Sequence, residues 1–248
     1  MTWTNLLRSE IRKLTTTRMP LAFVAVLVVL AATNGVAVAV GTDMDGSKSF
    51  IATGADQQSL MAFAANALMI TGLFGAIAAA REYAHSTVIA TYLASPRRPR
   101  ALGAQLAAVG LGGAILGLLG AALTVGAVAA SLPLTDYGFM VTAGGVAQVL
   151  AASAWAGACG AVLGAGIGTV VRNTGGAVTG AVLVLLILPP LIVQLANGTA
   201  AWVPSALANV ASGITNDTSV ASAGAAMALW ALVPALIALR VVRRRDIV

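Results

Sequence analysis

Few residues of this chain could do chemistry, and one segment, residues 41–49 (GTDMDGSKS), comes near a known chemical motif. It approaches the phosphate-binding loop G-x-x-x-x-G-K-[ST], in which backbone amides and a lysine hold nucleotide phosphates. Here Ser47 separates the glycine from Lys48, and the two aspartates of the segment would repel a phosphate group. Lys13, the only other lysine, is followed by Leu14. We therefore expect no nucleotide-binding loop in this chain.

Metal sites and nucleophilic sites are equally hard to assemble from this sequence. The chain has one histidine and one cysteine, whereas a metal site of the zinc type draws on three or four such ligands. The charged residues next to the long apolar runs stand at the ends of those runs: Arg81, Glu82, Arg172 and Arg240. Transporters driven by protons or sodium usually carry an ionisable group within the membrane. We therefore expect no catalytic, cofactor-binding or metal site in this chain. Such a protein must draw energy from a partner, conduct passively or act as a scaffold.

The composition explains why such residues are scarce. The 248 residues are 59% hydrophobic and 9% charged, whereas a soluble domain carries about 25% charged residues. A helix needs about 20 apolar residues to cross a hydrocarbon core. Six charge-free runs meet this length: Met19–Thr42, Gln57–Ala80, Ala101–Thr135, Tyr137–Val171, Asn173–Asn216 and Thr218–Leu239. The sequence therefore predicts an all-α integral membrane protein, in which residues 19–248 form six transmembrane helices over about 19–41, 58–80, 101–131, 140–171, 174–195 and 219–239.

The basic residues predict the orientation of these helices. Four regions hold every Lys and Arg except Lys48: residues 8–18, residues 81–100, Arg172 and residues 240–245. Six spans place all four on one side, and the positive-inside rule makes that side cytoplasmic. Each basic region adjoins a span, which favours membrane lipid headgroups over nucleic acid as its partner. Arginine outnumbers lysine and Ala, Gly and Val are abundant, which is typical of GC-rich bacteria, so we expect a bacterial plasma membrane with both termini in the cytoplasm.

Residues 1–18 precede the first span and fit an amphipathic interfacial helix. One arc of the helical wheel holds its large apolar side chains: Trp3, Leu6, Leu7, Ile11 and Leu14. Such a helix lies in the membrane interface with its basic residues at the headgroups. Glu10 also falls inside this arc, where a plain lipid-surface helix would not carry an acid. The alternative is a basic flank that only sets the topology of the first span.

Residues 82–94 are predicted to form a short amphipathic helix between the second and third spans. One side of this helix is apolar and holds Val88, Ile89, Tyr92 and Leu93. The other side is polar and holds Glu82, His85 and Ser86. Pro96 and Pro99 are expected to end it, because the proline ring removes the amide donor. A helix of this kind on the cytoplasmic side is expected where a soluble partner docks. The alternative is a loop that lies on the lipid headgroups.

Four segments together resemble the permease subunits of type-2 ABC exporters. REYAHSTVIATYLASPRRPRALGAQ, residues 81–105, resembles the family's pattern of Arg-Glu-Tyr/Phe, then His-Gly-Thr, then a Pro/Arg-rich stop. LLRSEIRKLTTTRMP resembles its N-terminal elbow helix, with Glu10 at an acidic position. GAGIGTVVRNTGGAVTGAVLVLL resembles its junction between the fourth and fifth spans, and VVRRRDIV its basic ending. Ser86 stands where the family usually has glycine, and Gln105 where it often has a basic residue.

The resemblance implies a division of labour between subunits. In the family, the segment after the second span is the coupling helix, which contacts a separate ATPase subunit. Carried onto this chain, the coupling residues are Glu82, Tyr83, His85, Ser86, Thr87, Val88, Ile89 and Tyr92; a local helix cap is the alternative role for Glu82. Two permeases, identical or homologous, would work with two ATPase subunits that hold Mg-ATP. The implied activity is ATP-driven export of a hydrophobic small molecule, an antibiotic or a lipid, along a route between the permeases.

Two further features concern the packing of the helices. Gly160, Gly164 and Gly168 recur every four residues in the fourth span, and such a stripe lets helix backbones approach closely. The stripe predicts contact either with another span of the chain or with a second subunit. Pro189 and Pro190 predict a kink or break in the fifth span, because neither residue can donate a backbone hydrogen bond. By resemblance, the fifth span and a re-entrant segment after it line the extracellular gate and the dimer interface.

Two other functions fit the same composition. A channel or facilitator that needs no ATPase predicts flux in vesicles that contain this chain alone. A membrane scaffold or immunity protein that transports nothing predicts that Glu82→Ala leaves the phenotype intact. A permease predicts the opposite result in both experiments.

Overall fold

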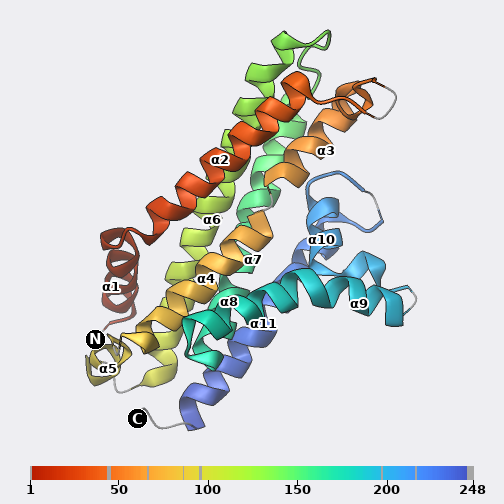
Figure 1. The fold of residues 1–248 in the computed structure, drawn as a ribbon. Coiled ribbons are helices and arrows are strands. Elements are labelled where there is room, and N and C mark those ends of the chain that lie inside the picture. Colours follow the sequence, from red (N-terminus) through yellow and green to blue (C-terminus); the bar gives the residue numbers. More distant parts are fainter. Residues whose placement is uncertain are drawn as a thin grey trace.

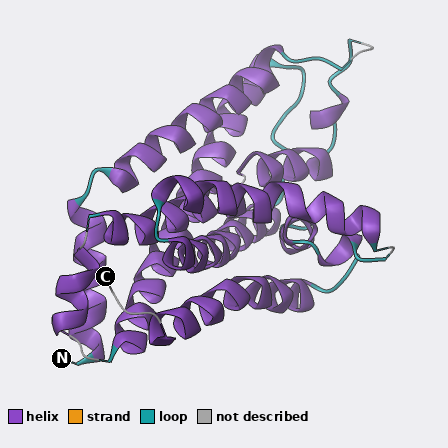
Figure 2. Ribbon diagram, turned by 60° about the horizontal axis from the view of Figure 1, so that its bottom comes forward, coloured by secondary structure: helices purple, strands orange, loops and turns teal. Residues whose placement is uncertain are grey.

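The computed structural model describes residues 2–43, 46–65, 67–85, 87–94, 97–196, 198–215 and 217–244, and the regular elements in these ranges are all helices (Figure 2). The long helices are α2 (Met19–Val40), α4 (Ala67–Ala84), α6 (Arg98–Ser131), α7 (Ala143–Val171) and α11 (Val220–Arg244). The shorter α-helices are α1 (Trp3–Thr16), α3 (Gly54–Ala65), α5 (Thr87–Ala94), α8 (Thr174–Val182), α9 (Leu188–Leu195) and α10 (Pro204–Ala211). The remaining elements are 3-10 turns at Ser49–Ile51, Leu132–Leu134 and Ala200–Trp202, and a π-helical segment at Leu183–Ile187.

Six helical segments of the described chain are long and apolar enough to cross a membrane, which makes this a multi-pass membrane protein. They are Met19–Val40, Gly54–Ala84, Arg98–Leu134, Ala143–Val171, Thr174–Leu195 and Val220–Arg244. The prediction of an all-helical protein with six spans is thereby confirmed. The second segment, made of α3 and α4, is longer than the expected 58–80, because polar residues at both of its ends continue the helix.

The bundle has one basic end. Figure 1 shows α1, α5 and the last turns of α11 gathered at the bottom of the molecule, whereas the end of α2 lies at the top. The basic end is defined here by residues 3–18, 81–100, 172–174 and 240–244, which carry every described basic residue but one. The exception, Lys48, donates from Nζ to the carbonyl oxygens of the last turn of α2, so its charge is partly balanced by the helix terminus. Asp45 and Arg245 lie outside the described residues.

Helix α7 lies at the centre of the bundle, where it packs against α4, α6 and α11. Its glycine stripe faces α4: Gly160, Gly164 and Gly168. A Cβ atom on these glycines would strike backbone oxygens of α4 that lie one turn apart, those of Leu68, Gly72 and Ala76. The structure therefore places the stripe between the second and fourth spans of the same chain, where close backbone approach substitutes for large interlocking side chains.

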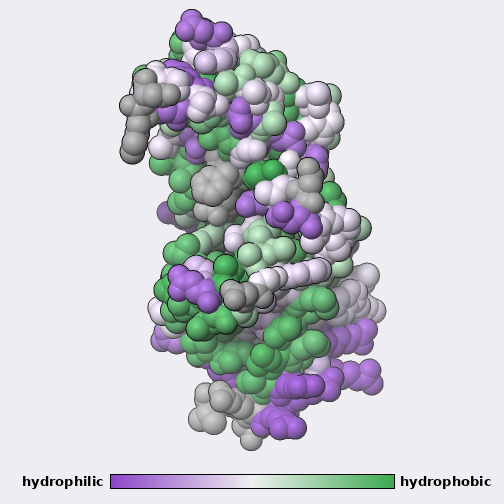
Figure 3. Space-filling model, turned by 90° about the vertical axis from the view of Figure 1, so that its right-hand side faces the viewer, coloured by the Kyte–Doolittle hydropathy of each residue, from purple (hydrophilic) through white to green (hydrophobic). Residues whose placement is uncertain are grey.

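Hydrophobic side chains also cover much of the exterior. Figure 3 shows them in green as a broad band on one face of the molecule, above hydrophilic side chains in purple at the bottom. The spans expose large apolar residues such as Leu21, Val29, Ile115 and Leu229. This surface suits a hydrocarbon solvent, in which an exposed leucine carries no penalty.

The fifth span does not break at its two prolines, where the sequence predicts a kink or a break. The α-helical pattern gives way at Leu183–Ile187 to a π-helical segment, in which the backbone N–H of Leu188 donates to the carbonyl oxygen of Leu183. Pro189 and Pro190 follow in the first turn of α9. Because the wider π turn shifts the hydrogen-bond pattern just ahead of the prolines, the missing donors change the helix type and do not end the helix.

Between α9 and α11 the chain folds back towards the bundle as α10 (Figure 1). This short helix packs against α11, α7 and α4. Two glutamines from other helices hold its C-terminal carbonyl groups. Gln58 donates from Nε2 to the oxygen of Ser212 at 2.9 Å, and Gln148 donates to the oxygen of Ala211 at 3.2 Å. These bonds satisfy helix-terminal acceptors that would otherwise lack partners.

A third glutamine, Gln57, fixes the loops at the end opposite the basic end, and its loss has a measurable cost. The fully buried amide donates to the carbonyl oxygens of Ile51 (3.1 Å) and Gly138 (2.9 Å), and accepts from the N–H of Met140 (3.0 Å). Gln57→Met should lower the free energy of unfolding by about 1–2 kcal/mol, because three backbone groups lose their partner. Gln58→Met removes one such bond and should cost less. Thermal unfolding of both variants in detergent checks this order; equal losses would contradict it.

Candidate functional site

The predicted helix over residues 82–94 is two helices in the structure. Helix α4 continues to Ala84, so Glu82 and Tyr83 belong to the last turn of the second span. Helix α5 begins only at Thr87, whose Oγ1 donates to the carbonyl oxygen of Glu82 at 3.3 Å. The boundary was misplaced because the Arg-Glu-Tyr segment is polar enough to suggest a loop, yet it completes the last turn of α4.

The prolines after α5 also differ from expectation. Pro99 lies in the first turn of α6 and starts that helix, where it was expected to end the preceding one. Proline is well suited to this position, because the first amides of a helix have no intrahelical acceptor. Pro96 and the predicted coupling residue Ser86 lie outside the described residues.

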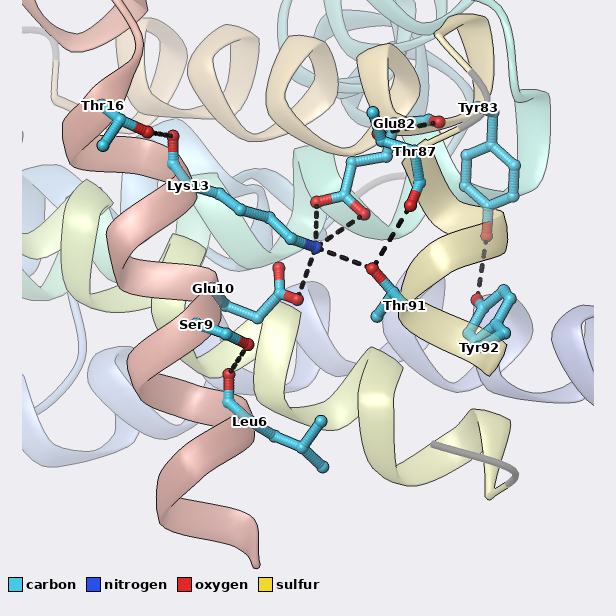
Figure 4. Close-up of polar contacts among 10 residues, drawn as sticks. All are labelled: Leu6, Ser9, Glu10, Lys13, Thr16, Glu82, Tyr83, Thr87, Thr91 and Tyr92. Carbon is cyan, nitrogen blue, oxygen red and sulfur yellow. Dashed lines mark hydrogen bonds and ion pairs between the residues drawn. The ribbon is translucent and has the colours of Figure 1, made fainter. Parts of the chain in front are cut away.

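Lys13 of α1 joins three helices at the basic end (Figure 4). Its Nζ donates to Glu10 Oε1 at 2.7 Å, to the two carboxylate oxygens of Glu82 at 3.2 and 3.4 Å, and to Thr91 Oγ1 at 2.9 Å. Glu10 lies on α1, Glu82 ends α4, and Thr91 lies on α5. These four residues are called the lysine junction below. One ammonium group thus connects the N-terminal helix, the second span and the short helix.

The lysine junction is largely shielded from water. Glu10 is 3% exposed, and the side chains of Glu82 and Lys13 are 15% and 36% exposed. Burial alone lowers the pKa of Lys13, but the carboxylates of Glu82 and Glu10 outweigh this effect, so the pKa of Lys13 is raised above its ordinary value. Lys13 therefore keeps its charge and offsets negative charge on the two carboxyl groups beside it.

A second set of contacts ties α5 to the junction between α7 and α8. The hydroxyl oxygens of Tyr83 and Tyr92 lie 3.3 Å apart (Figure 4). The pKa of Tyr92 is raised, mainly because the side chain is buried and in smaller part because of this contact. The guanidinium carbon of Arg172 lies 5.1 Å from the centre of the Tyr83 ring, within cation–π range. Arg172 ends α7 in the left-handed conformation, with φ of 57°, and Asn173 caps α8 by accepting from the N–H of Gly176. The fourth-to-fifth span junction therefore reaches the short helix.

Helix α5 has two apolar stripes, one facing the rest of the chain and one facing outwards. Val88 is buried and Tyr92 is half-buried, so this stripe packs against the chain. Ile89 and Leu93 are 44% and 81% exposed. The single apolar side predicted from the sequence is therefore divided into an inner and an outer stripe.

A groove of about 450 Å³ opens beside the lysine junction, between α1, α4 and α5. Its lining includes the charged side chains of Lys13, Arg81 and Glu82, together with His85 and Thr87. The last two are exposed. The groove therefore presents both signs of charge and a hydroxyl to whatever approaches the basic end.

Helix α1 packs on α6 along one side. Leu6 and Glu10 are buried, whereas Trp3 and Ile11 remain exposed and the other two predicted interfacial residues, Leu7 and Leu14, are half-buried. The Trp3 ring lies over Gly103 of α6, where a Cβ atom would come within 3.3 Å of it. The acid inside the apolar arc thus faces the protein and its partner Lys13, while part of the arc stays open to lipid.

Lys13, Thr91 and Arg172 could not be recognised from the sequence as members of this site. The available signal was Glu10 in an apolar arc, three residues before Lys13, a spacing that places two side chains on one helix face. Thr91 gave no signal, because its bond to Lys13 joins positions 78 residues apart.

Within the described ranges, no group of three or more His, Cys, Asp or Glu residues could hold a metal ion. The polar side chains of the lysine junction are instead bonded to one another. These bonds connect α5 to α1 and α4 through Lys13.

No protein-family model matches this sequence, and no curated protein matches it either.

Proposed function

We propose that this chain is the membrane-spanning permease subunit of a type-2 ABC exporter, driven by a separate ATPase that docks at the basic end. Two permeases, identical or homologous, and two ATPase subunits holding Mg-ATP would form the working complex. The cargo would be a hydrophobic small molecule, an antibiotic or a lipid. The complex would lie in a bacterial plasma membrane, with the basic end and both termini in the cytoplasm in accordance with the positive-inside rule.

The outer stripe of α5 is the single observation that carries this proposal. Ile89 and Leu93 expose apolar surface at the basic end, outside the six spans, while Val88 and Tyr92 anchor the same helix from its inner side. Apolar surface that is exposed outside the spans marks a site of interaction with a protein or a membrane surface, and we assign it to the ATPase. His85 and Thr87 are exposed as well, in the groove on the Lys13 side of the same short segment.

The contacts behind α5 supply a route for the motion. A partner that displaces α5 would act on Thr91 and, through Lys13, on Glu82 at the end of the second span. A second path, from Tyr92 through Tyr83, leads to the end of the fourth span. These two spans are the pair that packs through the glycine stripe, so ATP-driven closure would rock them as a unit.

Reconstitution with and without the ATPase tests the proposal. Liposomes that contain the chain alone should move none of a panel of fluorescent hydrophobic dyes and lipids, and adding an ABC ATPase that binds the chain should give ATP-dependent transport. Leu93→Asp should weaken ATPase binding by about tenfold or more, because a charge replaces an apolar contact at the centre of the interface. Leu134→Asp, at an exposed leucine of the opposite end, is the matched control and should bind as the unaltered protein does.

The outcomes distinguish the competing functions. Dye flux without the ATPase would favour a channel or facilitator. Unchanged phenotypes for both Leu93→Asp and Glu82→Ala would favour a scaffold or immunity protein.

A further inference from the structure

A cavity of about 270 Å³ lies inside the single chain, apart from the groove at the basic end. Its walls come from α3, α4, α7, the π-helical segment and α10. Two of these walls depart from regular transmembrane helices, because one is a π turn and the other is a helix that folds back towards the bundle. π turns are frequent at functional sites, and non-helical backbone at membrane depth usually lines a cavity.

The lining of the cavity is mainly apolar and carries no charge among the residues that the structure describes. Leu68, Ala156 and Leu185 form much of its wall, and Ser153 and Asn209 contribute polar groups. An apolar wall with a few polar groups is the usual composition of a small-molecule site.

Ser153 is the residue that points to a ligand. It is 4% exposed, and its hydroxyl makes no hydrogen bond to any residue in the described part of the chain. The hydroxyls of the other buried serine and threonine residues each donate to a backbone oxygen of the preceding turn: Thr71, Thr124, Ser131, Thr169 and Ser212. The half-buried Thr218, which does not line the cavity, also has a hydroxyl without a partner among the described residues. Buried hydroxyls rarely lack a partner, so the one that borders the cavity is left available for a group inside it. The side-chain amide of Asn209 is likewise without a partner among the described residues.

We propose that this cavity binds one small, uncharged amphiphile. Its hydrocarbon part would lie against Leu68, Ala156 and Leu185, and its hydroxyl or carbonyl group would bond Ser153 and Asn209. A charged ligand is disfavoured, because no described lining residue could compensate its desolvation. The volume lies just below the range of about 300–1,000 Å³ typical of ligand pockets, which suits an alcohol, phenol or amide of modest size. The inference does not require the proposed function, since binding needs neither ATP nor a second subunit.

The membrane is the source from which such a molecule would arrive. The opposite side of the π-helical segment lines an apolar groove of about 420 Å³, together with Leu188, Leu229 and Val233, whose side chains are exposed on the spans. Val184 borders this groove and its neighbour Leu185 borders the cavity. The π-helical segment therefore lies between the cavity and this groove, and Leu186, which lines the cavity, is itself exposed on the fifth span.

Photolabelling tests the proposal with an octanol that carries a diazirine group. Irradiation of the purified chain should give saturable labelling of peptides from α7 and α10, and excess 1-octanol should compete it away. Ala156→Phe fills the cavity and should reduce this labelling at least about fivefold. Ser153→Ala removes one oxygen and should weaken competition by about 3- to 10-fold, the usual effect of one hydrogen bond.

Ala151→Phe is the matched control, because residue 151 lies on the exposed side of α7 and should leave the labelling unchanged. If Ala156→Phe fails to fold, Ala208→Leu on α10 fills the same cavity, and Ser153→Ala decides alone if both larger variants fail. Two results would overturn the proposal. The first is labelling that is not saturable, and the second is labelling that stays as strong in Ser153→Ala and in the variants with a filled cavity. Either would show that the probe only partitions into lipid or detergent.

Discussion

Lys13→Met is expected to lower the free energy of unfolding by about 2 kcal/mol or more. The change leaves the carboxylates of Glu10 and Glu82 shielded from water and without their cation. Breaking a fully buried ion pair costs about 3–5 kcal/mol, and water at the 36% exposed lysine screens part of this. Titration of the detergent-solubilised protein with a denaturing detergent measures the loss.

Arg12→Met is the matched control for this prediction. Arg12 is the neighbouring basic residue on the same helix and is exposed, so its loss should change stability by less than about 0.5 kcal/mol. Adding Glu10→Gln to Lys13→Met should restore part of the lost stability, because it removes a shielded carboxyl group that has lost its cation. If Lys13→Met were as stable as the Arg12 variant, the lysine junction would contribute nothing measurable to the stability of the fold.

Gly164→Ala is the second large effect, and it comes from adding a single methyl group. The Cβ atom would strike the carbonyl oxygen of Gly72, which belongs to the backbone of α4 and cannot move aside as a flexible side chain could. The second and fourth spans would have to separate, at a cost of about 1–3 kcal/mol or more. Size-exclusion profiles and thermal unfolding in detergent should show a less stable, partly aggregated protein.

Gly126→Ala provides a control with the opposite sign. Gly126 lies on α6 with nothing within 4 Å of an added Cβ atom. Alanine favours a helix over glycine by about 1 kcal/mol, so this variant should be equal to or slightly more stable than the unaltered chain. Similar effects from the two substitutions would contradict the packing assigned to the glycine stripe.

The six spans could be predicted because they follow from composition along the chain. Charge-free runs of sufficient length fix the number of helices, and the residues at their ends fix which loops are basic. The end of the second span was less predictable, since Arg81 and Glu82 look like loop residues while the structure keeps them helical. Local polarity is a poor guide there, because long side chains at the end of a span reach the headgroups or a partner.

The lysine junction and the cavity could not be predicted, because both depend on contacts between distant positions. Lys13 looks like one more basic residue of an amphipathic helix until α4 and α5 bring their side chains to it. Ser153 looks like any small residue of a span, and only the π turn and α10 make a space beside it. The spacing of apolar residues and the positions of charged residues describe each helix alone. They carry no information on which helices pack against each other.

The lysine junction also has a consequence for the order of synthesis. Lys13 and Glu82 are separated by 69 positions, so the ribosome releases the lysine well before the second carboxylate exists. During that interval the partner available on the same helix is Glu10, three residues away. The bond from the first helix to Glu82 must therefore wait until the chain has emerged through its second crossing of the bilayer, and the packing of this helix on α6 must wait for the third.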